Sequence, residues 1–108
     1  MEQRVKKANN KLTFMNVYYL TFQASRISIL HSMANIELWA IDLSWDILAR
    51  FLPHYTLHGQ PLPREFIDDF VQVAVDETKH FRLLCERLKE LGSYFGALSV
   101  HNGECGLV

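Results

Sequence analysis

Apolar side chains recur at the three- and four-residue steps of an α-helix over two long stretches of this chain. From about Ser25 to Phe51 the sequence is rich in Leu, Ile, Ala and Met and lacks both Gly and Pro, which favours a helix of several turns. Its apolar stripe comprises Ile27, Leu30, Ala34, Glu37, Ile41, Trp45, Leu48 and Leu52. We expect a helix over residues 25–52.

A second helical stripe follows Pro63, a residue that suits the first turn of a helix. The stripe comprises Phe66, Phe70, Val73, Glu77, His80, Leu84, Leu88 and Leu91. Gly92, just beyond the cationic Lys89, is a C-cap signal. We expect this helix over residues 64–92.

The remaining segments flank or join these helices. The connection, residues 53–63, contains three prolines and a glycine and cannot be regular helix. In the leader, residues 1–24, the β-branched and aromatic side chains of Phe14–Phe22 leave three alternatives: an extension of the helix, an irregular arm, or pairing elsewhere. We treat the leader as an irregular arm and residues 93–108 as a short tail. The 108 residues then form one all-α domain, an antiparallel pair of long helices.

Three ionisable residues interrupt the apolar stripes. Glu37 lies in the middle of the first, and Glu77 and His80 lie three apart in the middle of the second. A carboxylate is very expensive to bury without compensation, so each glutamate needs a partner. That partner is either a metal ion or an ion-pair network, with the candidate cations Arg26, Arg50 and Arg82.

An antiparallel hairpin brings the midpoints of its two helices level, so Glu37 and Glu77 are expected to face each other. Two facing carboxylates repel unless a cation lies between them. Oxygen ligands combined with the imidazole of His80 suit iron or manganese, and zinc less readily. His31, near the same face as Glu37, is a fourth candidate: a metal ligand, a hydrogen-bond donor to a ligand, or a core histidine.

Three longer motifs carry a resemblance to a known family. They are LHSMANIELWAIDL at 30–43, VDETKHFRLLCERL at 75–88 and YFGALSVH at 94–101. From about Arg26 to Gly103 the chain resembles the domain of unknown function 455 family, which belongs to the ferritin-like superfamily. The resemblance implies an antiparallel helical bundle with a di-iron or di-manganese centre, and an oxidoreductase whose substrate is unsettled.

The chain departs from the family pattern at two places. The family usually has His two positions before the first glutamate, where this chain has Asn35. Family members also continue past this point with further helices that carry a second Glu and a second Glu-x-x-His, whereas this sequence ends at Val108. The resemblance therefore implies half of a ferritin-like four-helix bundle, apparently truncated, and half of the metal ligands.

This half-bundle has two functional interpretations. In the first, a homodimer or hetero-assembly through the apolar helix faces, or a longer chain, completes the bundle and a metal-dependent enzyme. In the second, the chain is a non-catalytic helical interaction module that has lost the complete metal site.

Composition and the lack of common motifs argue against several classes of function. Eleven basic against twelve acidic residues give a net charge of −1, so we expect neither nucleic acid nor a membrane as a partner. Cys85 and Cys105 form no scaffold or CxxC pair, which favours a reducing, cytoplasmic setting. There is no signal-peptide pattern, no membrane-span pattern and no nucleotide-loop or acyl-transfer motif.

Overall fold

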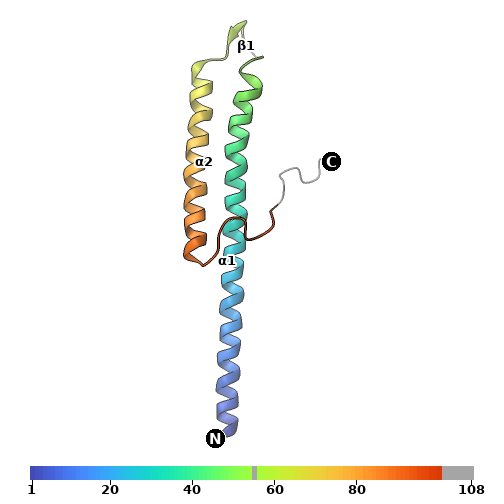
Figure 1. Cartoon of the computed structure of the whole chain (residues 1–108), viewed down its shortest axis with the longest axis vertical. Coiled ribbons are helices and arrows are strands. Elements are labelled where there is room, and N and C mark those ends of the chain that lie inside the picture. Colours follow the sequence, from blue (N-terminus) through green and yellow to red (C-terminus); the bar gives the residue numbers. More distant parts are fainter. Residues whose placement is uncertain (55, 101–108) are drawn as a thin grey trace, which may run out of the picture.

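Two long antiparallel α-helices dominate the fold in the computed structural model, which describes residues 1–54 and 56–100. Helix α1 spans Glu2–Phe51 and helix α2 spans Arg64–Glu90, and they lie side by side over the length of α2 (Figure 1). The molecule is a rod of 88 × 31 × 18 Å. The all-α fold expected from the sequence is confirmed.

Helix α1 begins at Glu2, well before the start near Ser25 that the sequence pattern indicated. Of the three alternatives for Phe14–Phe22, the structure has the extended helix. No Gly or Pro interrupts residues 1–52, and aromatic or β-branched residues disfavour a helix by only a few tenths of a kcal/mol each, roughly, against about 3 kcal/mol for proline. The N-terminal half of α1 therefore continues the helix and projects beyond α2 (Figure 1).

A tight hairpin makes the connection between the helices. Strands β1 (Thr56–Leu57) and β2 (Gln60–Pro61) pair antiparallel. His58 and Gly59 form the two-residue turn and both have positive φ, 52° and 75°, as a type I′ turn requires. The turn reverses the chain, and Pro63 then occupies the N-cap position of α2.

The end of α2 is fixed by the glycine that the sequence singled out. Gly92 has φ 81°, its N–H donates to the Lys89 carbonyl at 3.0 Å, and the Ser93 N–H donates to the Leu88 carbonyl at 2.9 Å. These two bonds are the Schellman arrangement, which satisfies the last carbonyls of a helix. The chain then turns back towards α1, where the Gln23 amide donates to the Leu91 carbonyl at 3.0 Å.

The interface between α1 and α2 has few buried residues and combines small with large side chains. Its buried residues are Ala34, Leu48, Ala74 and Leu88, together with the polar His31 and Ser44. Ser44 is buried because its hydroxyl donates to the Ala40 carbonyl at 2.8 Å. Trp45, which the expected stripe placed at the interface, is instead 50% exposed. The row of α1 that faces α2 is therefore the one that contains Ala34, Ser44 and Leu48.

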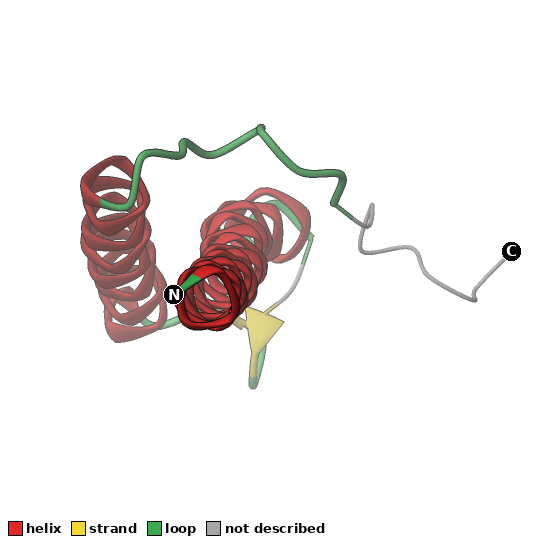
Figure 2. Cartoon of the chain, turned by 90° about the horizontal axis from the view of Figure 1, so that it is seen from below, coloured by secondary structure: helices red, strands yellow, loops and turns green. Residues whose placement is uncertain are grey.

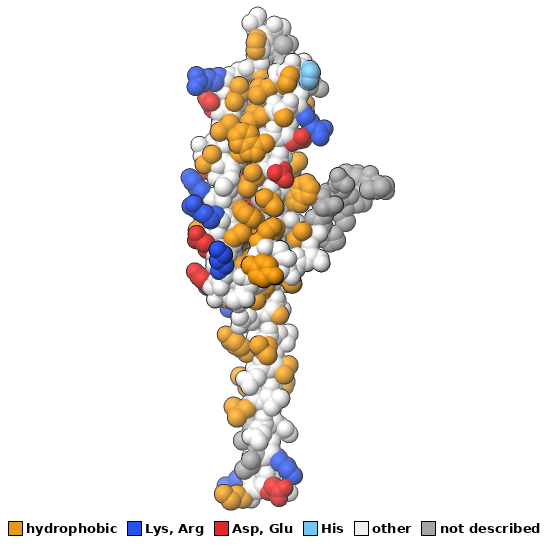
Figure 3. Space-filling model, viewed as in Figure 1, with side chains coloured by type: hydrophobic (Ala, Val, Ile, Leu, Met, Phe, Trp, Pro, Cys, Tyr) orange, Lys and Arg blue, Asp and Glu red, His pale blue; other side chains and the backbone are white. Residues whose placement is uncertain are grey.

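Large apolar side chains remain on the surface. Figure 3 shows them across both helices and along the projecting half of α1. Within the residues that the structure describes, neither helix contains a stretch apolar enough to cross a membrane.

Candidate metal centre

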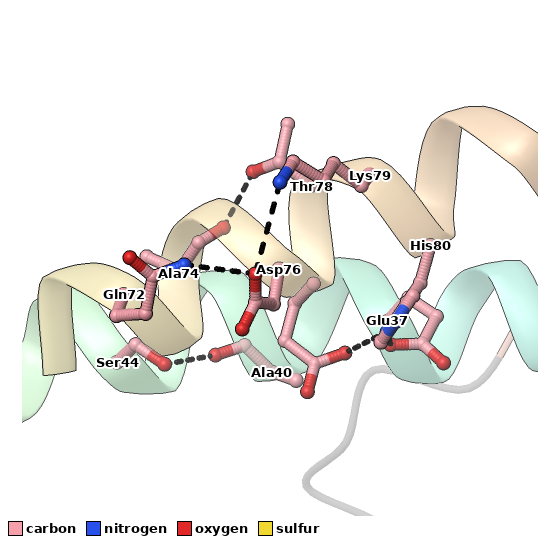
Figure 4. Close-up of polar contacts among 10 residues, drawn as sticks. Glu37, Ala40, Ser44, Gln72, Ala74, Asp76, Thr78, Lys79 and His80 are labelled. Carbon is pink, nitrogen blue, oxygen red and sulfur yellow. Dashed lines mark hydrogen bonds and ion pairs between the residues drawn. The ribbon is translucent and has the colours of Figure 1, made fainter. Parts of the chain in front are cut away.

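Glu37 of α1 meets Glu77 and His80 of α2 halfway along the helix pair. Each offers one ligand atom, and these atoms lie within 4.8 Å of one another. No other group of three or more acidic, histidine or cysteine side chains in the described residues comes together in this way. Figure 4 shows Glu37 and His80 close together where the two helices face each other. The structure thus brings together three of the four residues that the sequence singled out.

Two short contacts define the cluster. His80 Nδ1 lies 3.1 Å from Glu77 Oε2 on the same helix and 3.7 Å from Glu37 Oε2 on the other. The first contact follows from helical geometry, since residues three apart lie on one face. The second depends on the register between α1 and α2, which places Glu37 level with the Glu-x-x-His pair.

The cluster is at the edge of the interface, not at its centre. The side chains of Glu37 and Glu77 are 22% and 25% exposed, and that of His80 is 55% exposed. The buried row of α2 contains Ala74 and Leu88, so Val73 and His80 fall on the neighbouring row. The expectation that His80 lies on the buried stripe is therefore corrected: its imidazole is open to solvent on one side.

Hydrogen bonds and charge set the protonation of the three groups. A hydrogen bond shared with Glu77, then burial and the charge of Glu77, raise the pKa of Glu37. The same bond and the one with His80 lower the pKa of Glu77. The bond to Glu77, aided by the charges of Glu37 and Asp76, raises the pKa of His80 above its ordinary value. Without metal, the two carboxylates and the imidazole are therefore linked in their protonation.

Neighbouring charges are engaged elsewhere. Asp76 accepts from Gln72 at 2.9 Å and pairs with Lys79 at 4.0 Å (Figure 4). Of the arginines considered as partners of Glu77, Arg50 pairs with Asp46 at 2.8 Å and Arg26 lies 5.8 Å from the Phe22 ring centroid. Among the described residues, the ion-pair partner of both Glu37 and Glu77 is His80. None of the three candidate arginines, Arg82 included, pairs with either glutamate.

His31 lies apart from the cluster and holds the segment after α2. It is 1% exposed, and its Nε2 accepts the Gly96 N–H at 2.9 Å and the Leu98 N–H at 3.4 Å. Its ring stacks on Phe95 with centroids 4.9 Å apart, and Phe95 meets Phe81 edge-on. Because Nε2 accepts both bonds, the neutral ring carries its proton on Nδ1. Of the three roles considered for His31, these contacts are those of a core histidine.

Sequence reasoning missed this docking of the tail. Helical periodicity says nothing about a segment that is not helical, and the only signal was the motif at residues 94–101. Residues 101–108 of the expected tail, with Cys105, lie outside the described residues.

Two long antiparallel helices that bring two glutamates and a Glu-x-x-His histidine together define a helical carboxylate–histidine protein. The family model described as "Protein of unknown function (DUF455)" matches residues 5–104, and the chain belongs to this family, as the sequence motifs indicated.

A relative in Haemophilus influenzae, described as an uncharacterized protein, is 39% identical over 75 residues. The match covers 68% of this chain and 25% of the relative, so the chain spans about a quarter of that protein's length. No solved structure matches the chain.

Proposed function

We propose that the chain binds a divalent transition metal, iron or manganese, through Glu37, Glu77 and His80. The observation that carries the proposal is the convergence of two carboxylates and one imidazole, from two helices, within 4.8 Å. A structural ion pair needs one acid and one base. A second carboxylate at the same place is repulsive unless a proton or a metal ion neutralises it.

The distances fit a shared ion. Metal–oxygen and metal–nitrogen bonds of about 2.0–2.2 Å place two ligands of one ion roughly 3–4.4 Å apart. The contacts of His80 with Glu77 and Glu37, 3.1 and 3.7 Å, are already within that span. The widest separation in the cluster, up to 4.8 Å, needs only a small side-chain rotation.

The donor set favours iron or manganese. Two hard carboxylate oxygens and one borderline imidazole nitrogen suit these ions, and zinc less readily. A metal ion competes with protons for the carboxylates and the imidazole, so binding releases protons and strengthens as pH rises.

Three protein ligands leave coordination positions open on the exposed side. Water, or ligands from another helix pair in an assembly or a longer chain, would fill them. In a completed bundle, iron or manganese would supply oxidative chemistry with dioxygen or peroxide as co-substrate. This oxidoreductase activity belongs to the completed bundle, and a reducing compartment such as the cytoplasm would keep the metal and Cys85 reduced.

A second candidate function is a non-catalytic interaction module. The exposed apolar residues along α1 favour it, because such surfaces mark association sites. Metal content separates the two candidates, since a pure interaction module needs no ion.

The test is elemental analysis of the purified chain after anaerobic loading with Fe(II) or Mn(II) and removal of excess metal. We expect stoichiometric metal, with affinity at least tenfold lower in Glu37→Ala and Glu77→Ala. Glu86→Ala, an exposed acid on the same helix, is the matched control and should bind as the wild type does. Absence of stoichiometric metal at neutral pH, or equal binding by Glu77→Ala, would refute the proposal.

A further inference from the structure

Helix α1 carries a second apolar row, separate from the face that packs on α2. Its large members alternate at three- and four-residue steps and are each between 45% and 64% exposed: Leu12, Met15, Tyr19, Phe22, Ile29, Met33, Ile36 and Leu43. Arg26 and Ala40 continue the same spacing. A 3.5-residue apolar repeat of this length is the pattern of a coiled-coil seam. We call these ten residues the α1 seam.

The large members of the seam are exposed in the part of the chain that the structure describes. The face of α1 that meets α2 contains Ala34 and Leu48, and the segment after α2 binds through His31. Figure 2, viewed along the rod, shows α2 beside α1 and the segment after α2 crossing a different flank. The remaining flank carries the seam.

The N-terminal half of α1 has an unpacked surface that a partner could cover. Residues 2–22 project beyond α2, and no other described helix lies beside them (Figure 1). Most of the stability of helices in proteins comes from the packing of an apolar face. The seam runs from this projecting half into the half that lies beside α2. A partner helix along the seam would therefore cover both.

We propose that the occupant of the α1 seam is the α1 seam of a second copy, paired antiparallel about a two-fold axis near Ile27. In this register the seam is complementary to itself along its whole length. The facing layers are Leu12 with Leu43, Met15 with Ala40, Tyr19 with Ile36, Phe22 with Met33, and Arg26 with Ile29 of the second copy. Arg26 is the one charged layer, and its long side chain can reach solvent while its stem packs.

Charge complementarity selects this antiparallel register. Lys11 and Asp46 flank the seam, and the register places Lys11 beside Asp46 of the second copy, twice per dimer. The Asp46 carboxylate already accepts Arg50 on its own helix at 2.8 Å and has lone pairs left for Lys11. In a parallel pair the two copies of a flanking position lie on opposite sides of the seam, and Lys11 and Asp46 are far apart along the axis. A parallel pair, or a shift by one heptad, would therefore lose the contact.

The dimer keeps the two candidate metal centres apart. Antiparallel pairing about Ile27 separates Glu37 from Glu37 of the second copy by about 28 Å along the axis, at a rise of about 1.5 Å per residue. Each cluster stays a separate site. The pairing is therefore independent of the proposed metal function, and metal-free protein can be used to test it.

Disulfide trapping tests the register directly. In a Cys85→Ser, Cys105→Ser background, the double variant Leu12→Cys, Leu43→Cys should form an interchain disulfide dimer under mild oxidation. Leu12→Cys alone should not, because the antiparallel register puts the two copies of position 12 at opposite ends. Cross-linking of the single variant, or none in the double variant, would overturn the proposal.

The mass of the protein in solution tests whether the α1 seam is the surface through which two copies pair. We expect a dimer by analytical ultracentrifugation, and Ile36→Glu should raise its dissociation constant more than tenfold. Leu83→Glu, equally apolar and 60% exposed but on α2, is the matched control and should leave the dimer intact. A monomeric wild type at micromolar concentration, or equal effects of the two variants, would contradict the proposal.

Charge reversal gives a further signature of the Lys11–Asp46 contact. Lys11→Asp and Asp46→Lys should each weaken the dimer several-fold, and the double variant should regain most of the loss. Lys6→Asp, on the same exposed arm but away from the seam, is the control. No recovery in the double variant would exclude this register.

Discussion

At the scale of single residues, the sequence indicated which side chains come together where the two helices meet. Glu77 and His80 could be paired from sequence because their contact lies within one helix. Glu37 could be placed opposite because an antiparallel hairpin aligns the midpoints of its helices. The exposure of His80 could not be foreseen, because it depends on which of two adjacent rows of α2 faces α1.

The His80–Glu77 pair predicts a pH dependence of the metal-free protein. The pKa of His80 is raised in the folded state. The pair's contribution to stability is therefore complete below the ordinary histidine value of about 6.5 and is lost as pH rises through the raised value. Urea unfolding in the presence of a chelator should show a small loss of stability as pH rises above about 6.5, and His80→Gln should abolish this loss.

The control for this titration is His54→Gln, an exposed histidine in the connection. The free energy of unfolding of His54→Gln should change with pH in the same way as that of the wild type. A His80→Gln profile parallel to that of the wild type would contradict the assignment.

His31 predicts a larger effect on stability. His31→Phe keeps an aromatic ring against Phe95 but removes the acceptor of the Gly96 and Leu98 N–H groups. Gly96 and Leu98 are exposed residues, so water can replace part of the lost bonding, and losing hydrogen bonds of this kind costs roughly 0.5–1.5 kcal/mol each. We expect a loss of that size in urea unfolding, together with faster hydrogen exchange at these two amides. His54→Phe should change neither, and unchanged exchange at Gly96 in His31→Phe would refute this role.

At the scale of elements, α2 was predicted closely and α1 was not. The bounds of α2 are set by local signals, Pro63 before it and Gly92 after it, and these are readable in sequence. The start of α1 carries no such signal. Its aromatic residues resembled an irregular arm, whereas their 3.5-residue spacing, continued into the second half of α1, was the sign of one helix.

Gly92 predicts a measurable contribution from the cap of α2. At φ 81°, a residue with a Cβ is strained even though the space around Gly92 is open. Gly92→Ala should destabilise the fold by about 1 kcal/mol, measured by urea unfolding. Ser93→Ala, which keeps the backbone bond to Leu88, should cost much less. Equal stability of Gly92→Ala and the wild type would contradict the role of this cap.

At the scale of the whole molecule, the helix pair has few buried residues for its length. Only Ala34, Leu48, Ala74 and Leu88 are buried apolar residues in the part that the structure describes. Ligands and partners that bind only the folded state add to its stability. A metal at the Glu37 cluster and a second copy on the α1 seam would act at different places on the rod.

The helical hairpin could be predicted from the sequence, but the packing of its segments against one another could not. The position of residues 92–98 depends on the tertiary contacts of His31, Gln23 and Phe95. The rotation of α1 that buries Ser44 and exposes Trp45 depends on which row of α1 packs against α2. Both arise from packing between distant segments, which a periodic pattern does not encode.

The central claim is metal binding at Glu37, Glu77 and His80, and Mn(II) titration followed by nitrogen-15 NMR tests it most directly. Paramagnetic Mn(II) broadens only nearby resonances. The account predicts broadening centred on the amides around Glu37 and around Glu77–His80 at substoichiometric Mn(II), with the arm before Phe22 unaffected, and its loss in Glu77→Ala. Broadening centred elsewhere, or none near these residues, would contradict it.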